Sequence, residues 1–425
     1  MSTRKICILS IDGGGIRGII PAEVLVSLEK KLRYRVKGAN LIDYFDFFAG
    51  TSTGGLITCA LLLPNQTMKE PEYDAAFVAN LYKKRGKDIF HSRISLENKF
   101  LNKLVSPLNE FISYIEEKYS RHGLNAILEE TFGHEELRNL LKPCLITGYN
   151  IQKRQSMLFR QHKAKTHSDY NFSVKDVCAA TSAAPTYFEP FLIESSSGHE
   201  SPIVDGGVVL NNPVLSAYSE VRKAVMKVTE RKDIIKKDEN DETHRQFAET
   251  TKTQGLAAAD MFILSLGTGT KLTNYHYEQA QKWGIIEWAK PIIDILMSGS
   301  AEIMNYVTDK MFDTLPHSDG YIRIDTDKLY DASSQMDDVS EKNIHNLEQA
   351  GKNLAEQNSD LLDSVVDFLI ANQELDKKFT VELDFSQSKK FAKKDSLLQP
   401  ETKVSKKDAP PLKEKPFAWK LPKIL

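Results

Sequence analysis

Short apolar runs rich in β-branched residues alternate with amphipathic stretches along most of the chain. Lys5–Ile11 forms such a run, glycines follow it, and a pattern typical of a helix covers Ile19–Arg35. Tyr44–Ala49 is predicted as a second strand, and Leu56–Leu63 as the buried start of a helix. Strands that alternate with helices favour an α/β fold with a largely parallel sheet.

The alternation continues through the rest of the chain, with one polar interruption. Further helices are predicted over Pro71–Phe90, Asn98–Phe132, Lys175–Ala184, from the turn after Asp205 to about Lys227, and over Glu341–Leu369. Further strands are predicted over Pro143–Asn150, Pro202–Val204, Asp260–Leu266 and Tyr321–Ile324. Residues 229–254 are almost all polar or charged, which indicates a solvated or partly disordered excursion. We therefore predict one large domain over residues 1–384 and a flexible Lys- and Pro-rich tail over residues 385–425.

The charge balance argues against a protein built around nucleic acid. The net charge of the 425 residues is −2, whereas nucleic-acid-binding domains usually present a basic surface. The average hides an asymmetry, because Ser388–Leu425 carries eleven Lys and only four acidic residues. This tail is therefore +7 and the remainder of the chain is −9.

The cysteines and the first residues indicate the compartment. The four cysteines lie in apolar stretches without short pair spacings or a Cys/His cluster, so we expect buried thiols of a reducing compartment and no metal site. The opening MSTRKICILSIDGGG leads directly into a predicted strand, so we expect no signal peptide. No apolar stretch approaches roughly 18 residues, so we predict a cytoplasmic protein that reaches membranes only from the water side.

The first motif with a chemical meaning is Gly50-Thr51-Ser52-Thr53-Gly54, a G-x-S-x-G pattern between a predicted strand and a predicted helix. This is the context of a nucleophile elbow, in which a strained turn presents the serine hydroxyl. Glycine is needed at Gly50 and Gly54 because side chains there would collide with neighbouring backbone. The pattern alone is weak evidence, since a glycine-rich turn without chemistry looks the same.

The second motif, Asp12-Gly13-Gly14-Gly15-Ile16-Arg17-Gly18, also lies between a strand and a helix. Consecutive glycines leave backbone N–H groups accessible, and the helix N-terminus adds its dipole, so the segment forms an anion cradle. It fits the dinucleotide fingerprint G-x-G-x-x-G, and it equally fits an oxyanion hole. No G-K-[ST] follows, which excludes the P-loop version, and no well-placed acidic residue for a ribose follows either.

The third motif is Asp205-Gly206-Gly207, directly after the apolar pair Ile203-Val204. An Asp-Gly pair is most often only a turn. A serine nucleophile, however, needs a base within hydrogen-bond reach, and that base is usually histidine. The histidines considered for this role, His91, His122, His134 and His317, lie in polar or helical contexts without a glycine turn. A direct dyad of Ser52 and Asp205 needs no histidine.

These three motifs in this order resemble the patatin-like phospholipase family, and the chain looks particularly similar to plant patatins. The resemblance extends over about Lys5–Leu369 and includes the segments LSIDGGGIRGIIPAEVL, DYFDFFAGTSTGGLIT, CAATSAAPTYFEP, IVDGG, ILSLGTGT, KWGIIEW and MDDVSEKNIHNLEQAGKNL. It implies a three-layer α/β/α sandwich with a mostly parallel central sheet. A joint match of all segments in order is far more specific than any one of them.

Carried over by position, the resemblance implies Ser52 as nucleophile and Asp205 as its base. It implies an oxyanion hole at Gly13, Gly14 and Gly15, with Arg17 beside it. The expected reaction is hydrolysis of acyl esters in phospholipids, lysophospholipids or acylglycerols at a membrane surface, without calcium or another cofactor. Several relatives need an activating ligand or protein, so a partner of that kind is an open expectation.

Two features depart from the plant proteins and leave alternatives open. We expect no secretory signal like that of a vacuolar patatin, and the Lys-rich tail resembles no segment of the plant proteins. Both fit a cytosolic enzyme, or a protein exported without a cleaved signal. The tail, with its interleaved aromatic residues, is either a membrane-docking segment, or a solvated disordered tail or secretion signal. For the whole chain, the alternatives are a nucleotide-binding regulator and a catalytically silent lipid-binding or storage protein.

Overall fold

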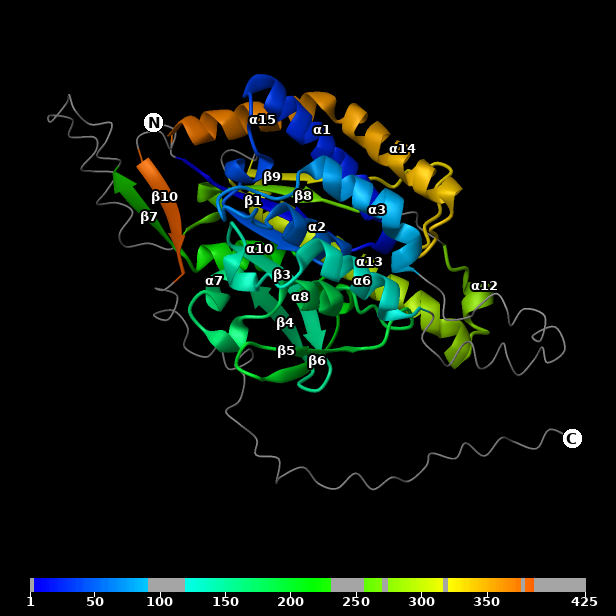
Figure 1. The fold of residues 1–425 in the computed structure, drawn as a ribbon. Helices are drawn as coiled ribbons and strands as arrows, with labels where there is room; N and C mark the ends of the chain where they lie inside the picture. The colour runs from blue at the N-terminus through cyan, green and yellow to red at the C-terminus, as the bar shows by residue number, and fades with distance from the viewer. Residues whose placement is uncertain are drawn as a thin grey trace, which may run out of the picture.

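A computed structural model describes residues 4–90, 119–230, 256–269, 274–315, 320–375 and 379–385. An eight-stranded sheet lies at the centre, in the order β5-β6-β3-β2-β1-β8-β9, with β4 paired to β3 (Figure 1). Helices cover both of its faces, so the predicted three-layer α/β/α architecture is confirmed.

The middle of the sheet is parallel. Its five strands are β1 (Ile6–Ile11), β2 (Phe47–Gly50), β3 (Cys144–Asn150), β8 (Met261–Leu266) and β9 (Tyr321–Ile324). Parallel neighbours need a crossover, which helix α1 (Ile19–Arg35) provides between β1 and β2. All five strands were predicted from their apolar runs, because strands covered on both faces carry few polar residues.

Antiparallel strands extend one side of the sheet. These are β4 (Gln155–Arg160), β5 (Phe191–Glu194) and β6 (Glu200–Asp205). Only β6 was predicted, as Pro202–Val204. The other two strands are only partly buried, so they lack the apolar run that marked the central strands.

Alternate residues of β1 show why three layers form. Cys7, Leu9 and Ile11 point into the larger core, whereas Ile6 and Ile8 point into the second core on the opposite face. The larger core is closed by α1, α2 (Thr53–Leu61), α3 (Ala75–Ile89), α6 (Arg121–Phe132), α8 (Val174–Thr181), α14 (Glu341–Gln357) and α15 (Ser359–Glu374). The second core is closed by α10 (Val214–Arg222) and α13 (Ile285–Asp313).

Three sequence predictions need correction. The helix expected to continue to about Lys227 ends at Arg222, and Val225–Glu230 is instead strand β7, which pairs with β10 (Phe379–Asp384) about 150 residues later. The long helical region from Glu341 is two helices that meet at Asn358. Helix α13 was not predicted at all, because Pro291 interrupts its pattern and apolar side chains occur around much of its circumference.

Several predictions concern residues that the structure does not describe. The polar excursion lies almost entirely within 231–255, and the tail beyond 385 lies outside as well. The first part of the helix expected over Asn98–Phe132 also lies outside, so α6 confirms only its end. The four cysteines are buried and form no disulfide, as expected. Among the helices that are described, none is both long and apolar enough to span a bilayer.

The second core gives a direct test of this architecture. Phe312 on α13 is only 1 % exposed and its ring packs against Tyr218 of α10. We expect Phe312→Ala to lower the free energy of unfolding by about 3–5 kcal/mol, as for other buried Phe-to-Ala changes. Ile303→Ala, at a position 50 % exposed on the same helix, should change it by less than about 0.5 kcal/mol. Equal effects in urea denaturation would contradict the assignment of this face of α13 to the core.

Candidate active site

The turn between β2 and α2 holds Ser52 in an unusual backbone conformation. Its φ and ψ angles are 53° and −121°, which place a non-glycine residue in the positive-φ region. A Cβ atom on Gly50 would lie 2.3 Å from the carbonyl oxygen of Gly54, and one on Gly54 would lie 2.2 Å from that of Ile11. The predicted strand–turn–helix context is therefore confirmed, and its two flanking positions have no room for a side chain.

Buried threonines fix this turn. The Ser52 N–H donates to Thr181 Oγ1 at 2.9 Å, and Thr181 Oγ1 donates to the Thr147 carbonyl at 2.6 Å. Thr147 Oγ1 donates to Thr51 Oγ1 at 2.8 Å, and Thr51 Oγ1 donates to the Leu210 carbonyl at 2.7 Å. The chain of hydrogen bonds joins β3, the turn and helix α8. Sequence analysis did not identify the roles of Thr147 and Thr181, because single threonines in apolar segments carry no motif.

Asp205 is the last residue of β6 and lies near the level of the sheet at which the Ser52 turn begins. Gly50 pairs with Ile146 on β3, and Gly148, two residues further along β3, pairs with Asp205 on β6. Ser52 also lies two residues beyond Gly50, so the sheet register brings these two predicted residues together. Both line one pocket.

The carboxylate of Asp205 is buried and only half satisfied. Its Oδ1 accepts from the Gly207 N–H at 2.7 Å, whereas Oδ2 has no hydrogen-bond partner. Burial raises the pKa of Asp205 to about 7, although the nearby Ser52 hydroxyl and the Gly207 N–H oppose this rise. No hydrogen bond of normal geometry joins Ser52 to Asp205, so Oδ2 remains available as a proton acceptor.

The pocket around Ser52 and Asp205 is mainly apolar. The space between its walls is about 510 Å³ when the open mouth is included. Its walls are hydrocarbon and aromatic side chains, among them Leu56, Ile89, Phe90, Leu124, Phe188 and Met297. Such walls favour an apolar chain over a sugar or a nucleotide base.

The glycine loop after β1 passes beside the serine. A Cβ atom on Gly13 would lie 3.3 Å from Cβ of Ser52, and Gly15 lines the pocket. The Gly13 N–H already donates to the Asn211 carbonyl at 3.1 Å. In the described part of the chain, the N–H groups of Gly14 and Gly15 form no hydrogen bond. Within the described residues, these two N–H groups are therefore not committed to another acceptor.

Gly15 must be a glycine, and Arg17 holds the loop from outside the pocket. Gly15 has a φ angle of +59°, and a Cβ atom there would lie 2.3 Å from the Met336 carbonyl oxygen. Arg17 does not line the pocket. Its guanidinium donates to the carbonyl oxygen of Gly269 at 2.5 Å and to that of Gly14 at 3.4 Å. Arg17 thus ties the loop to the turn after β8.

The histidines do not supply an alternative base among the residues described. None of them lines the pocket that holds Ser52 and Asp205. His162 is engaged elsewhere, with Nε2 at 3.0 Å from Glu220 and its ring stacked on Phe385. His122 and His134 are exposed, and His91 and His317 lie outside the described residues. The described side chains also contain no group of three or more His, Cys, Asp or Glu placed to hold a metal ion.

Comparison with known proteins identifies relatives. A family model described as patatin-like phospholipase matches residues 9–218. Patatin-like protein 1 of Arabidopsis thaliana is 34 % identical over 365 residues, which cover 82 % of this chain and 81 % of that protein. The probable inactive patatin-3-Kuras 1 of Solanum tuberosum is 30 % identical over 358 residues, covering 82 % and 86 %. Human GIVD cytosolic phospholipase A2 matches as a solved structure with TM-score 0.42 and 10 % identity, over 87 % of this chain and 60 % of that chain.

The collisions at the turn predict a large effect from one methyl group. We expect Gly54→Ala to destabilise the protein by about 1–3 kcal/mol, because the Ile11 carbonyl must move. Gly299→Ala is the matched control, since a Cβ atom on that helical glycine meets nothing within 4 Å. It should stabilise the protein by up to about 1 kcal/mol. Urea denaturation of both variants measures the difference, and a neutral Gly54→Ala would refute the packing described for the turn.

The raised pKa of Asp205 predicts a pH-dependent effect on stability. The folded protein holds this proton up to pH about 7, whereas an unfolded aspartate loses it near pH 4. Raising the pH through this window therefore destabilises the folded wild type, and Asn, which cannot ionise, avoids the loss. We expect the Tm of Asp205→Asn, relative to wild type, to rise between pH 5 and pH 8. The exposed Asp327→Asn should show no such trend, and a pH-independent difference for Asp205→Asn would contradict a buried carboxylate with a raised pKa.

Proposed function

This chain belongs to the patatin-like phospholipase family, and from that premise we propose that it is a serine esterase of the phospholipase A or lysophospholipase type. Membership of the family supports lipid hydrolase activity in general. The observation that carries the finer proposal is the meeting of Ser52 and Asp205 in one apolar pocket. The serine lies on a strained turn, and the carboxylate oxygen Oδ2 has no other partner.

In the first half-reaction, Ser52 Oγ attacks the ester carbonyl carbon while Asp205 Oδ2 takes the hydroxyl proton. The carbonyl oxygen becomes an oxyanion, which the N–H groups of Gly14 and Gly15 stabilise. One such donor contributes about 3–4 kcal/mol to transition-state stabilisation in other serine hydrolases. The tetrahedral intermediate then collapses, and the departing alcohol or lysolipid takes the proton from Asp205.

In the second half-reaction, water attacks the acyl-serine ester. Asp205 accepts a proton from this water and returns it to Ser52 Oγ as the fatty acid leaves. The same carboxylate therefore serves both halves, which requires a pKa near the working pH rather than near 4. Burial of Asp205 provides that pKa.

The walls of the pocket support a fatty-acyl substrate. Side chains from α2, α3, α6 and α13 enclose the space next to Ser52, so an acyl chain would exchange water for hydrocarbon there. We propose phospholipids or acylglycerols at a membrane surface as the substrate, with no cofactor in the chemical steps. The proposed compartment is the cytoplasm, with peripheral membrane contact.

The two rival functions are less well supported. A phosphate-binding loop at Gly13–Gly18 would need its N–H groups directed at a phosphate, but Gly13 already donates to Asn211, and Gly15 faces the apolar pocket. A catalytically silent lipid-binding protein is the stronger rival, because one relative carries the name probable inactive patatin. The intact pair of Ser52 and Asp205 favours catalysis over that rival.

The acyl-serine mechanism predicts loss of labelling and of hydrolysis in one variant. A fluorophosphonate probe should label the wild type covalently, and phospholipid vesicles should release fatty acid. Ser52→Ala should abolish both, while Ser364→Ala, an exposed serine on α15, should preserve both. Hydrolysis that persists in Ser52→Ala would refute the nucleophile. Labelling without fatty-acid release would support Ser52 as the nucleophile but contradict phospholipid as the substrate.

The role of Asp205 predicts the pH dependence of the reaction. Its carboxylate must be ionised to accept the proton, so kcat/KM for a soluble neutral ester should rise with pH and level off above an apparent pKa of about 7. Stopped assays between pH 5 and pH 9 measure this profile. A flat profile, or a midpoint near pH 4, would contradict Asp205 as the general base. Asp205→Asn should remove the rising limb together with most of the rate.

A further inference from the structure

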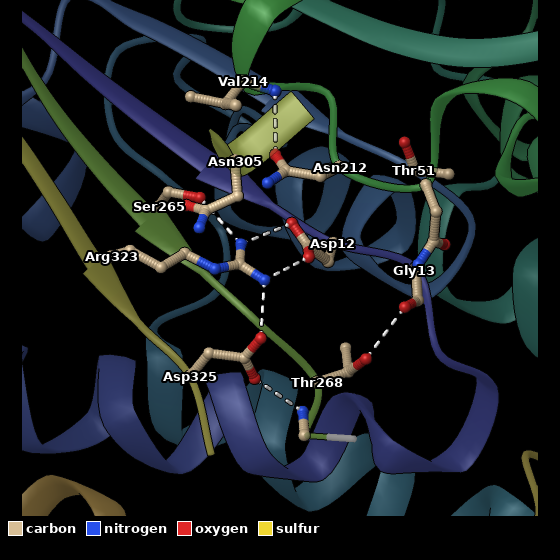
Figure 2. A network of polar contacts seen from close by, with 12 residues as sticks. Asp12, Gly13, Thr51, Asn212, Val214, Ser265, Thr268, Asn305, Arg323 and Asp325 are labelled. Carbon is tan, nitrogen blue, oxygen red and sulfur yellow. Dashed lines mark hydrogen bonds and ion pairs between the residues drawn. The ribbon is translucent and has the colours of Figure 1, made fainter. Parts of the chain in front are cut away.

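A largely shielded arginine outside the pocket lies at the centre of a polar network behind the glycine loop (Figure 2). Arg323, on β9, donates to both carboxylate oxygens of Asp12, at 2.9 Å and 2.6 Å. It also donates to Ser265 Oγ at 2.8 Å and to Asp325 Oδ2 at 2.7 Å. Its side chain is 15 % exposed and that of Asp12 is 3 % exposed, so this cluster is largely shielded from water.

The network reaches the glycine loop from two sides. On one side, Asp12 is the residue directly before Gly13, and its own N–H donates to the Leu266 carbonyl at 3.0 Å. On the other side, Asp325 Oδ1 accepts from the Gly269 N–H at 3.0 Å. Both paths therefore start at the guanidinium of Arg323 and end next to the loop.

The turn after β8 contacts the glycine loop directly. Thr268 Oγ1 donates to the Gly13 carbonyl at 2.8 Å, as Figure 2 shows, and Gly269 accepts from Arg17. A Cβ atom on Gly267 would lie 2.0 Å from Cγ of Asp325, and one on Gly14 would lie 2.2 Å from Thr268 Oγ1. The backbone of the turn and that of the loop are thus packed tightly against the network, and small movements of Arg323 would be passed on to them.

The loop needs such support for a physical reason. Three successive glycines have more backbone freedom than any other tripeptide, and they have no side chains of their own to fix their position. An oxyanion hole is effective only if its donors are already aimed before the reaction begins. The order of Gly14 and Gly15 must therefore come from neighbouring residues.

Arginine suits this role better than lysine. Its planar guanidinium binds a carboxylate through two parallel hydrogen bonds, which fixes direction as well as distance. Here the same group also holds Asp325 and Ser265, so one rigid plane sets the positions of three acceptors. A lysine ammonium would keep the charge but lose the fixed plane.

We propose that Arg323 is a positioning residue for acyl transfer: through Asp12 and Asp325 it holds the glycine loop so that the N–H groups of Gly14 and Gly15 face the oxyanion. Arg323 does not line the pocket, so it acts only through its neighbours. The inference rests on the proposed esterase function.

The test compares two similar, largely shielded Arg–Asp pairs at opposite ends of β1. Arg4 binds both oxygens of Asp46, at 2.9 Å and 2.6 Å, and precedes the strand, whereas Arg323 binds Asp12 after it. We expect Arg323→Lys to lower kcat for a soluble ester by about 10²-fold, the loss typical of one oxyanion donor, with KM changed by less than about twofold. Arg4→Lys should leave kcat unchanged even where it lowers Tm by a similar amount.

A second readout separates oxyanion stabilisation from general damage. An alkyl trifluoromethyl ketone forms a tetrahedral adduct with a negatively charged oxygen, so its inhibition constant should rise in Arg323→Lys by the same factor as kcat falls. The Kd of an unreactive ether analogue of the substrate should stay the same. Parallel loss of affinity for both compounds, or equal kcat losses in Arg323→Lys and Arg4→Lys, would overturn the proposal.

A milder variant keeps the test decisive if Arg323→Lys does not fold. Asp325→Asn retains an acceptor for the Gly269 N–H but removes the charge that faces Arg323. It should lower kcat and raise the inhibition constant of the ketone by the same factor, and this factor should be smaller than in Arg323→Lys. A kcat and an inhibition constant equal to those of the wild type would overturn the proposal. A wild type that neither labels nor hydrolyses esters would instead refute the proposed function itself.

Discussion

The parallel register between β1 and its two neighbours is the constraint on which the site depends. Ile11 pairs with Gly50 on one side and with Leu266 on the other, so three strands end at the same level. The segments that follow them are the glycine loop, the Ser52 turn and the turn of Gly267–Gly269, and they meet because the strands do. The Thr268 hydroxyl and Arg17 join the turn of Gly267–Gly269 to the glycine loop, and Thr181 of α8 holds the Ser52 turn.

The site combines this rigid frame with groups that are costly to bury. Asp205 would be more stable in water, and Ser52 would be more relaxed with a negative φ angle. The frame holds both because the surrounding cores are large and closely packed on each face of the sheet. Chemistry and stability thus oppose each other at these two residues, and the opposition is confined to a few positions rather than spread over the fold.

The sequence predicted what is encoded locally. The central strands, the helix after β1 and the turn at Ser52 each carry their pattern within about 20 residues, and the structure confirms them. Strands β7 and β10 depend on a distant partner and were missed. Strands β4 and β5 were missed for another reason, because they are only partly buried and lack an apolar run. The network around Arg323 is the extreme case, because its main ion pair joins residues 311 positions apart. An arginine in a strand of four residues gives no local sign of its partner.

That separation has a consequence for a chain during its synthesis. Ser52 and the glycine loop leave the ribosome early, whereas Arg323 and Asp325 follow some 270 residues later. Domains tend to fold as units once enough of the chain has emerged, at about 5–20 residues per second. An incomplete chain therefore carries Ser52 and the glycine loop for many seconds without β8 and β9. The contacts between the glycine loop and the turn after β8 can therefore form only once most of the chain has been made.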